Sequence, residues 1–133
     1  MVCTMCDSKT RTSNSRFMSR GIYVWRRRTC PRCHSVFTTH ENVDMKRSHR
    51  VQDTDGKLDQ FVREKLFLSI YESLRHRQEA ISDASGITDT TISKILAEKR
   101  LIIPKDRIVE ITSSVLRRFD RAAYIRYISM NKF

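Results

Sequence analysis

The sequence predicts an α+β protein: a small β module followed by a helical bundle that carries a short β-hairpin. Three observations support this prediction. All four cysteines fall within the first 33 residues, a strand-like stretch lies between them, and apolar residues recur at helical spacing from residue 61 onward. A chain of 133 residues is long enough for one ordinary domain or two very small ones.

The cysteines form two matched pairs, each with two residues between its members, and 23 residues separate the pairs. This C-x2-C…C-x2-C layout is typical of a structural zinc site, because one tight turn presents two sulfurs and two turns complete a tetrahedral shell. We therefore expect one structural Zn²⁺ per chain, held by four thiolates with no position open for a substrate water. Its ligands are Cys3, Cys6, Cys30 and Cys33.

Two disulfides, four unrelated thiols or a redox pair are the alternatives to zinc. Disulfides require an oxidising compartment, and the first ten residues, MVCTMCDSKT, have neither the apolar stretch nor the cleavage site of a secretory signal. A redox motif needs only one cysteine pair and sits near a βαβ pattern, which the sequence does not display. Zinc is the favoured interpretation.

Two strands are predicted at residues 10–17 and 22–29, joined around Ser19-Arg20-Gly21, and a short extended stretch follows at 36–39. The second strand is rich in β-branched and aromatic residues. Strands that end in cysteine knuckles describe a small β zinc ribbon. His34 and His40 have a spacing that fits a two-Cys two-His finger, but Cys30 and Cys33 already fill the site, so we expect both histidines at the surface.

Positive charge is concentrated in the N-terminal part of the chain. Residues 1–50 carry 11 Lys and Arg against three acids, a net charge of +8, whereas residues 51–133 carry 15 against 12, a net charge of +3. A compact basic module attracts polyanions, of which nucleic acid is the usual one; the alternative is a charged surface that only keeps the chain soluble. No apolar run reaches the roughly 18 residues of a membrane span, so no membrane partner is expected.

The second half begins with a linker and a hairpin. Residues 42–50 are polar, basic and aperiodic, which indicates a linker. The Asp-Gly pair within 53–57 predicts a hairpin turn between short strands anchored by Val51, Leu58 and Phe61. We assign residues 1–45 to the zinc ribbon, 46–50 to the linker and 51–133 to the second domain.

Helices are predicted over most of the remaining chain. Residues 61–77 carry an apolar stripe through Leu66, Ile70 and Leu74. Helical stretches follow near 79–85 and 90–99, with Gly86 interrupting them and Asp89 capping the second. Pro104 begins another helix, and Asp120 caps a last short one.

Residues 78–96 also mimic a DNA-binding helix-turn-helix, with a central Gly86 and a polar opening at residues 88–91. Asp89 would repel phosphate at the position where such motifs contact DNA. An ordinary helical turn of a bundle is therefore the favoured interpretation, with the helix-turn-helix as the alternative.

Several motifs in order along the chain resemble the NrdR family, the bacterial repressors of ribonucleotide reductase genes. In the first domain the similarity is carried by the cysteine pairs, the run Arg26-Arg27-Arg28-Thr29-Cys30-Pro31-Arg32-Cys33 and the stretch Phe37-Thr38-Thr39-His40-Glu41. The second domain resembles the ATP-cone of that family at Asp55-Gly56, at Phe61-Val62-Arg63-Glu64-Lys65-Leu66 and at Ala123-Tyr124-Ile125-Arg126-Tyr127.

The resemblance implies a regulator whose zinc ribbon binds double-stranded DNA and whose ATP-cone-like domain binds ATP or dATP and sets the state of a homo-oligomer. It also implies a bacterial cytoplasmic protein associated with the nucleoid. The residues carried over for DNA are Arg16, Arg26, Arg27 and Arg28, because guanidinium groups bind phosphates and guanine edges. Alternation along a strand puts Arg26 and Arg28 on one face and Arg27 on the other, so at most one set faces a duplex squarely.

The chain departs from the family at two places. Where the cone usually opens with Val-x-Lys-Arg-Asp-Gly, this sequence has Val51-Gln52-Asp53-Thr54-Asp55-Gly56, so a basic pair that binds phosphates is missing. Val51, Lys57 and Lys65 remain as nucleotide-binding candidates. The residue after each second cysteine, usually Gly, is Asp7 or His34 here, and both residue types tolerate a left-handed conformation.

Three functions remain open at this point. The first is a DNA-binding repressor with a nucleotide-responsive cone, and the second is a DNA-binding protein whose cone has lost its ligand and only mediates assembly. The third is a zinc-ribbon adaptor that binds a protein. An enzyme is not expected, because no Ser/Cys–His pairing, open metal site or Gly-rich phosphate loop is visible.

Overall fold

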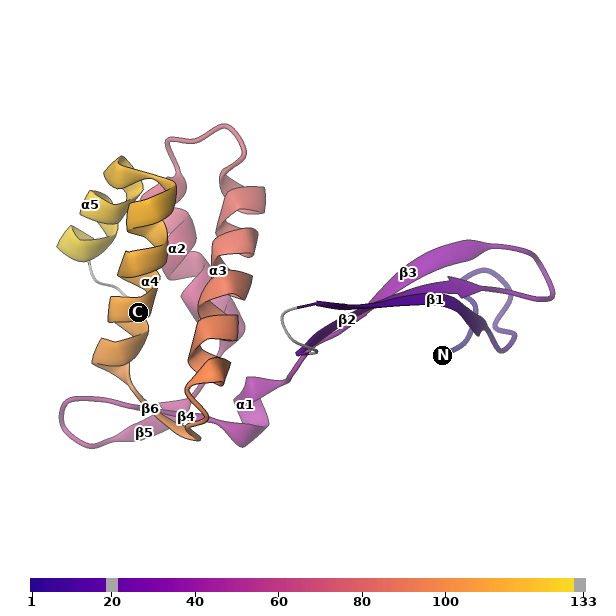
Figure 1. Ribbon diagram of the computed structural model, residues 1–133, viewed down its shortest axis with the longest axis horizontal. Coiled ribbons are helices and arrows are strands. Elements are labelled where there is room, and N and C mark those ends of the chain that lie inside the picture. Colours follow the sequence, from indigo (N-terminus) through magenta and orange to yellow (C-terminus); the bar gives the residue numbers. More distant parts are fainter. Residues whose placement is uncertain (19–21, 131–133) are drawn as a thin grey trace. The chain divides into compact units, whose positions relative to one another are not determined.

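The structure is a computed structural model that describes residues 1–18 and 22–130 (Figure 1). It divides the chain into two compact units, Met1–Val43 and Asp44–Phe133. Each unit has its own secondary structure and is described by itself below. The chain as a whole is α+β.

The first unit is a three-stranded antiparallel sheet made of β1 (Arg11–Met18), β2 (Tyr23–Thr29) and β3 (Val36–Glu41), in that spatial order (Figure 1). These strands lie where the sequence predicted them, and β3 is two residues longer than expected. The predicted turn at Ser19-Arg20-Gly21 lies outside the described residues. A bridge between Val2 and Lys9 closes the N-terminal cysteine turn.

The sheet of the first unit has almost no apolar core. Among its described residues, the buried hydrophobic side chains are those of Cys3, Val24 and Cys30. A sheet with so little buried apolar surface lacks the hydrophobic stabilisation that a small domain needs, and a structural metal is one of the usual substitutes. We therefore expect the fold of this unit to depend on the cysteine cluster.

The second unit contains a small sheet at one end of a helical bundle (Figure 1). Strand β4 (Arg50–Gln52) pairs antiparallel with β5 (Leu58–Gln60) through the predicted hairpin, whose Gly56 has a φ of 84°. A third strand that was not predicted, β6 (Ile102–Pro104), pairs parallel with β4 from a distant part of the chain. Strand order β5-β4-β6 makes β4 the central strand.

Four helices form the body of the second unit: α2 (Arg63–Leu74), α3 (Ala80–Ala97), α4 (Lys105–Phe119) and α5 (Arg121–Met130). Their buried faces share one hydrophobic core that also takes in Phe61 and Ile103 from the sheet end. Pro104 directly precedes α4 and Asp120 precedes α5, as predicted.

Helix α3 corrects one prediction. Instead of two helices broken at Gly86, a single helix of 18 residues runs through that position. Ala84, Ile87 and Thr88 keep a continuous buried face across it, and this burial outweighs the roughly 1 kcal/mol that glycine costs in a helix. Asp89 is therefore not a cap; it lies within the helix and forms an ion pair with Arg63 of α2 at 2.7 Å.

The continuous helix also removes the helix-turn-helix alternative for residues 78–96. That motif requires a turn between two helices, and residues 80–97 contain none. No DNA-reading helix of this type is present in that segment.

The basic segment 42–50 is more structured than the sequence suggested. It includes the short helix α1 (Met45–Ser48), capped by the Asp44 carboxylate, which accepts a hydrogen bond from the Lys46 backbone N–H. Met45 is 4% exposed and belongs to the core of the second unit. An isolated methionine among charged residues carries no periodic signal, so this contact was not visible in the sequence.

Within the described parts of the chain, no helix combines the length and the apolar character that crossing a membrane requires.

Candidate zinc centre and nucleic-acid interface

Two turns of the same geometry bring the cysteines together. In the first, the Asp7 backbone N–H donates to the Cys3 carbonyl; in the second, the His34 backbone N–H donates to the Cys30 carbonyl. The residue after each second cysteine is left-handed, with φ values of 58° at Asp7 and 62° at His34. The prediction that these two residue types would support the knuckles is confirmed.

Backbone N–H groups inside each turn point at sulfur. The Met5 N–H donates to Cys3 Sγ at 3.3 Å, and the Cys33 N–H donates to Cys30 Sγ at 3.4 Å. Such donors stabilise thiolates, the form in which cysteine binds a metal.

The four Sγ atoms all lie within 4.8 Å of one another. The Cys3–Cys33 and Cys6–Cys30 sulfurs are each 3.5 Å apart, far beyond the roughly 2.05 Å of a disulfide bond. Four thiolates at about 2.3 Å from a tetrahedral zinc ion lie about 3.8 Å from each other, which these separations match. The cysteine cluster is therefore arranged to bind one structural zinc ion, and the disulfide alternative does not fit.

A serine that the sequence analysis overlooked stands beside the cluster. The Ser35 hydroxyl lies 3.0 Å from Cys3 Sγ and 3.1 Å from Cys33 Sγ. Its hydrogen bond, followed by that of the Met5 N–H, lowers the pKa of the Cys3 thiol to about 6. The signal for Ser35 was present in the sequence, because Ser8 and Ser35 occupy equivalent positions two residues after each pair.

Both histidines of the first unit lie outside the cysteine cluster. His34 and His40 are exposed, and neither belongs to the metal-binding group. His40 contacts Tyr23 instead: the Tyr23 hydroxyl forms a hydrogen bond with His40 Nδ1. The expectation that the histidines are surface residues and not ligands is confirmed.

The strand register sorts the ribbon side chains onto two faces. We call them the Arg26 face and the Arg27 face. The Arg26 face includes Ser15, Val24, Arg26, Arg28, Thr39 and Glu41. The Arg27 face includes Arg11, Asn14, Arg16, Trp25, Arg27 and Thr38.

The four arginines proposed for DNA thus do not share a surface. Arg26 and Arg28 lie on one face, and Arg16 and Arg27 on the other. Alternation along the strand predicted that Arg27 lies opposite Arg26 and Arg28, and the register places Arg16 on the same face as Arg27.

The nucleotide candidates lie at the sheet end of the second unit. Val51 is a buried residue of the central strand β4 and belongs to the core. Lys57 is exposed just after the hairpin turn, and Lys65 is exposed on α2.

Two carboxylates occupy the hairpin turn between these candidates. Asp53 accepts a hydrogen bond from the Thr54 backbone N–H at 2.7 Å, and Asp55 accepts one from the Lys57 backbone N–H at 2.9 Å. The Thr54 bond, together with the charges of Lys105 and Lys57, lowers the pKa of Asp53, so this carboxylate is charged at neutral pH. A charged acid at this position opposes a triphosphate.

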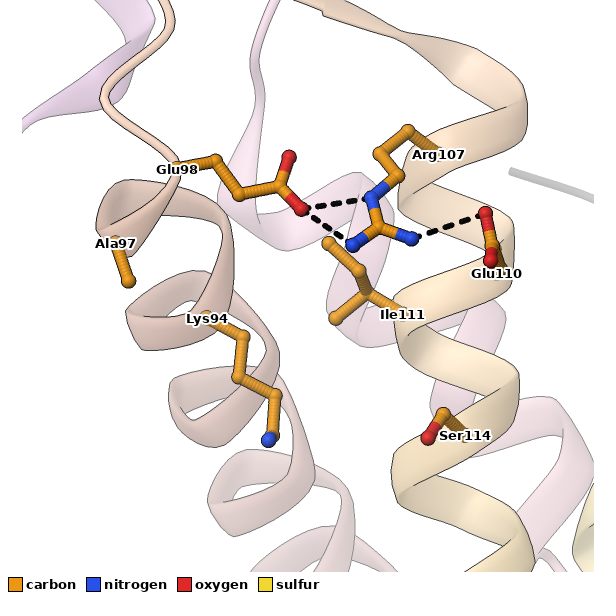
Figure 2. A pocket seen from close by; sticks show the side chains of 7 residues that line it. All are labelled: Lys94, Ala97, Glu98, Arg107, Glu110, Ile111 and Ser114. Carbon is orange, nitrogen blue, oxygen red and sulfur yellow. Dashed lines mark hydrogen bonds and ion pairs between the residues drawn. The ribbon is translucent and has the colours of Figure 1, made fainter.

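A pocket of about 310 Å³ lies elsewhere in the unit, between α3 and α4 (Figure 2). Arg107 bridges two acids at its rim: Nε donates to Glu98 at 2.7 Å, and Nη1 pairs with Glu110 at 3.0 Å (Figure 2). With Lys94 as the other cation in the lining, the charges balance. The lining therefore has no net positive charge that would attract a polyanion.

Comparison with known proteins finds the same family for the N-terminal unit alone and for nearly the whole chain. Residues 1–41 match the family described as transcriptional repressor NrdR-like, N-terminal domain. Over nearly its whole length the chain is similar to proteins named transcriptional repressor NrdR. With the Aromatoleum aromaticum protein it shares 33% identity over 131 residues, which is 98% of this chain and 76% of the relative.

Two further relatives carry the same name. The Fervidobacterium nodosum protein is 32% identical over 133 residues, covering 99% of this chain and 86% of the relative. The Anaplasma phagocytophilum protein is 34% identical over 131 residues, covering 98% and 85%. Together with a four-cysteine ribbon that is built to hold zinc, these similarities show that the chain belongs to the NrdR family of transcriptional repressors.

Proposed function

We propose that this protein is a DNA-binding transcriptional repressor of ribonucleotide reductase type genes. Its zinc ribbon contacts double-stranded DNA, and its ATP-cone-like unit controls homo-oligomerisation. In this role it is a binding protein and not an enzyme, and it acts in the bacterial cytoplasm at the nucleoid. The family resemblance offers the ribbon arginines Arg16, Arg26, Arg27 and Arg28 as candidates for the contacts with DNA, and the face of the sheet that meets the duplex decides which of them take part.

The main support for the proposal is the positive charge on the sheet of the zinc ribbon, in a chain that belongs to a family of transcriptional repressors. Strands β1–β3 bear five arginines and one acid, Glu41. A sheet that has no apolar face to bury presents these guanidinium groups to solvent, where they can neutralise phosphates. Metal binding would stabilise the fold of the sheet, and the sheet would hold the arginines in defined positions.

Duplex binding tests this function directly. Zinc-loaded protein should shift double-stranded DNA at low salt, and the logarithm of its affinity should fall linearly with the logarithm of the salt concentration as counterions are released. Fluorescence anisotropy with a labelled duplex measures both. A protein that ignores duplex DNA at low salt is not a DNA-binding repressor.

Two candidates exist for how the second unit controls assembly. The family resemblance favours a response to ATP or dATP, in which Val51, Lys57 and Lys65 would take part in the site. The second candidate is a unit that mediates assembly without a nucleotide. Asp53, a carboxylate at a position where the family usually has a cation, favours this second candidate.

Light-scattering mass measurements separate the two candidates. Nucleotide control predicts that the mass of the assembly changes when ATP is exchanged for dATP, and the second candidate predicts the same mass in both. If the loss of the basic pair is the reason, the double variant Asp53→Lys with Thr54→Arg gains nucleotide binding by isothermal titration calorimetry, because two phosphate-binding cations replace one acid and one neutral residue. The variant Glu79→Lys, at the residue that precedes α3, adds positive charge outside the small sheet and serves as the control.

A further inference from the structure

The two faces of the ribbon differ in how their arginines are engaged. On the Arg26 face, Arg26 donates to the Ser15 hydroxyl at 3.1 Å and lies 3.6 Å from the Glu41 carboxylate. Arg28 on the same face donates to the Thr39 hydroxyl at 3.4 Å. These bonds cross from β2 to both neighbouring strands, so both guanidinium groups hold the sheet together.

The Arg27 face carries more uncompensated charge. It bears Arg11, Arg16 and Arg27 and no acid, whereas the Arg26 face bears two arginines and Glu41. Arg27 is exposed. Arg16 lies over the ring of Trp25, with its guanidinium carbon 5.5 Å from the ring centroid, which restricts its orientation while leaving its donors toward solvent.

Arg27 is the centre of a row that crosses all three strands. Its cross-strand neighbours are Asn14 on β1 and Thr38 on β3. These three residue types are the ones that read base edges in the major groove: Arg binds guanine O6 and N7, Asn binds adenine N6 and N7, and Thr contacts either a polar edge or the thymine methyl group. The matching row on the other face, Ser15–Arg26–Thr39, is occupied by the bonds described above.

We propose that the Arg27 face is the DNA-reading surface, with Asn14, Arg27 and Thr38 contacting bases and Arg11 and Arg16 contacting the flanking phosphates. This inference rests on the proposed DNA-binding function and names its specificity-determining residues. Neighbouring strands are about 4.8 Å apart, so the row spans about 10 Å, and a major groove about 12 Å wide accommodates it. Arg26 and Arg28 then act as positioning residues that stiffen the sheet.

A matched pair of neighbouring arginines tests the proposal. The zinc-loaded full chain selects its preferred sequence from a labelled duplex pool with a randomised centre. Anisotropy then measures each variant on the selected duplex and on a shuffled duplex of the same composition. Arg27→Gln should reduce the preference for the selected duplex by about tenfold or more, while Arg28→Gln leaves that preference unchanged. Thr38→Val, which keeps the side-chain shape, and Asn14→Ala should each relax the preference at one base position.

Trp25 provides a readout that needs no variant. It is the single tryptophan of the chain and lies on the Arg27 face. Bound duplex should therefore protect its fluorescence from quenching by acrylamide. Zinc content and circular dichroism verify that each variant retains the ribbon.

Each outcome has a separate meaning. Loss of preference in Arg28→Gln but not in Arg27→Gln, equal loss in both, unprotected Trp25 in the DNA complex, or selection without any preferred sequence overturns the inference while DNA binding stands. If the wild-type chain binds no duplex at low salt, the proposed function fails and the inference falls with it.

Discussion

At the residue scale, the Asp120 carboxylate accepts three hydrogen bonds in the second unit. It follows α4 and begins α5, where one carboxylate oxygen accepts the Ala123 backbone N–H at 3.0 Å. The other accepts from Arg77 at 2.9 Å and from His76 Nε2 at 3.1 Å. The Ala123 bond, followed by those of Arg77 and His76, lowers the pKa of Asp120 well below its ordinary value.

We predict that Asp120→Ala lowers the free energy of unfolding by about 0.5–2 kcal/mol at neutral pH, the range found for the loss of a helix N-cap. The folded pKa is depressed, so the contribution of Asp120 is complete above its unfolded value of 3.8 and disappears as pH falls below it. Urea unfolding at several pH values measures this. The difference between wild type and variant should shrink as the pH drops from neutral to about 2.

The exposed Asp106, in the first turn of α4, supplies the control. Asp106→Ala should cost less than Asp120→Ala at neutral pH, because the Asp106 carboxylate makes no hydrogen bond or ion pair with the described residues and is stabilised mainly by the helix dipole. A variant pair with equal losses would contradict the role assigned to Asp120.

At the element scale, two glycines that the sequence marked as breaks in regular structure lie in different environments. Gly56 lies in the hairpin turn with φ at 84°, a conformation that L side chains rarely adopt. Gly86 lies inside α3, and a Cβ built there meets no atom within 4 Å. The turn therefore favours glycine at position 56, whereas glycine at position 86 only lowers the stability of the helix.

Two alanine substitutions should consequently change stability in opposite directions. Gly86→Ala should raise the free energy of unfolding by about 1 kcal/mol, because alanine is the better helix former and has free space. Gly56→Ala should lower it by about 1–2 kcal/mol through left-handed strain. Urea unfolding followed by far-ultraviolet circular dichroism measures both. A destabilising Gly86→Ala would contradict the continuous helix.

At the scale of the whole molecule, the two units are stabilised by different interactions. The second unit has a hydrophobic core that is shared by four helices and the sheet end. The first has four sulfurs and a sheet with exposed faces. Removing the metal should therefore affect one unit only, since binding of zinc contributes directly to the folding of small metal domains.

We predict that a zinc chelator changes the fluorescence of Trp25, the sole tryptophan, while the helical circular dichroism signal of the second unit is retained. Re-addition of zinc should restore the fluorescence and, with it, duplex binding. If the helical signal fell in parallel with the fluorescence, the two units would not be independent in stability.

The sequence determined the local features of this protein. Cysteine spacing identified the metal ligands, β-branched residues and alternation located the ribbon strands, and Pro104 and Asp120 marked the helix starts. Each signal resides in a few neighbouring residues, because turns, caps and strand patterns are set by local backbone chemistry. The family resemblance was available for the same reason, since motif spacing survives divergence elsewhere.

Features that depend on distant contacts required the tertiary structure. The pairing of β6 with β4 joins segments about fifty residues apart, and the core contact of Met45 lies in a segment that read as a linker. Helix α3 continues through Gly86 only because its buried face packs against α2 and α4. On the ribbon, the alternation of side chains along β2 is enough to put Arg26 and Arg27 on opposite faces. Only the register among the three strands brings Arg27 into one row with Asn14 and Thr38. Local chemistry thus fixed which groups the chain carries, while cross-strand and core contacts decided which of them meet on one surface.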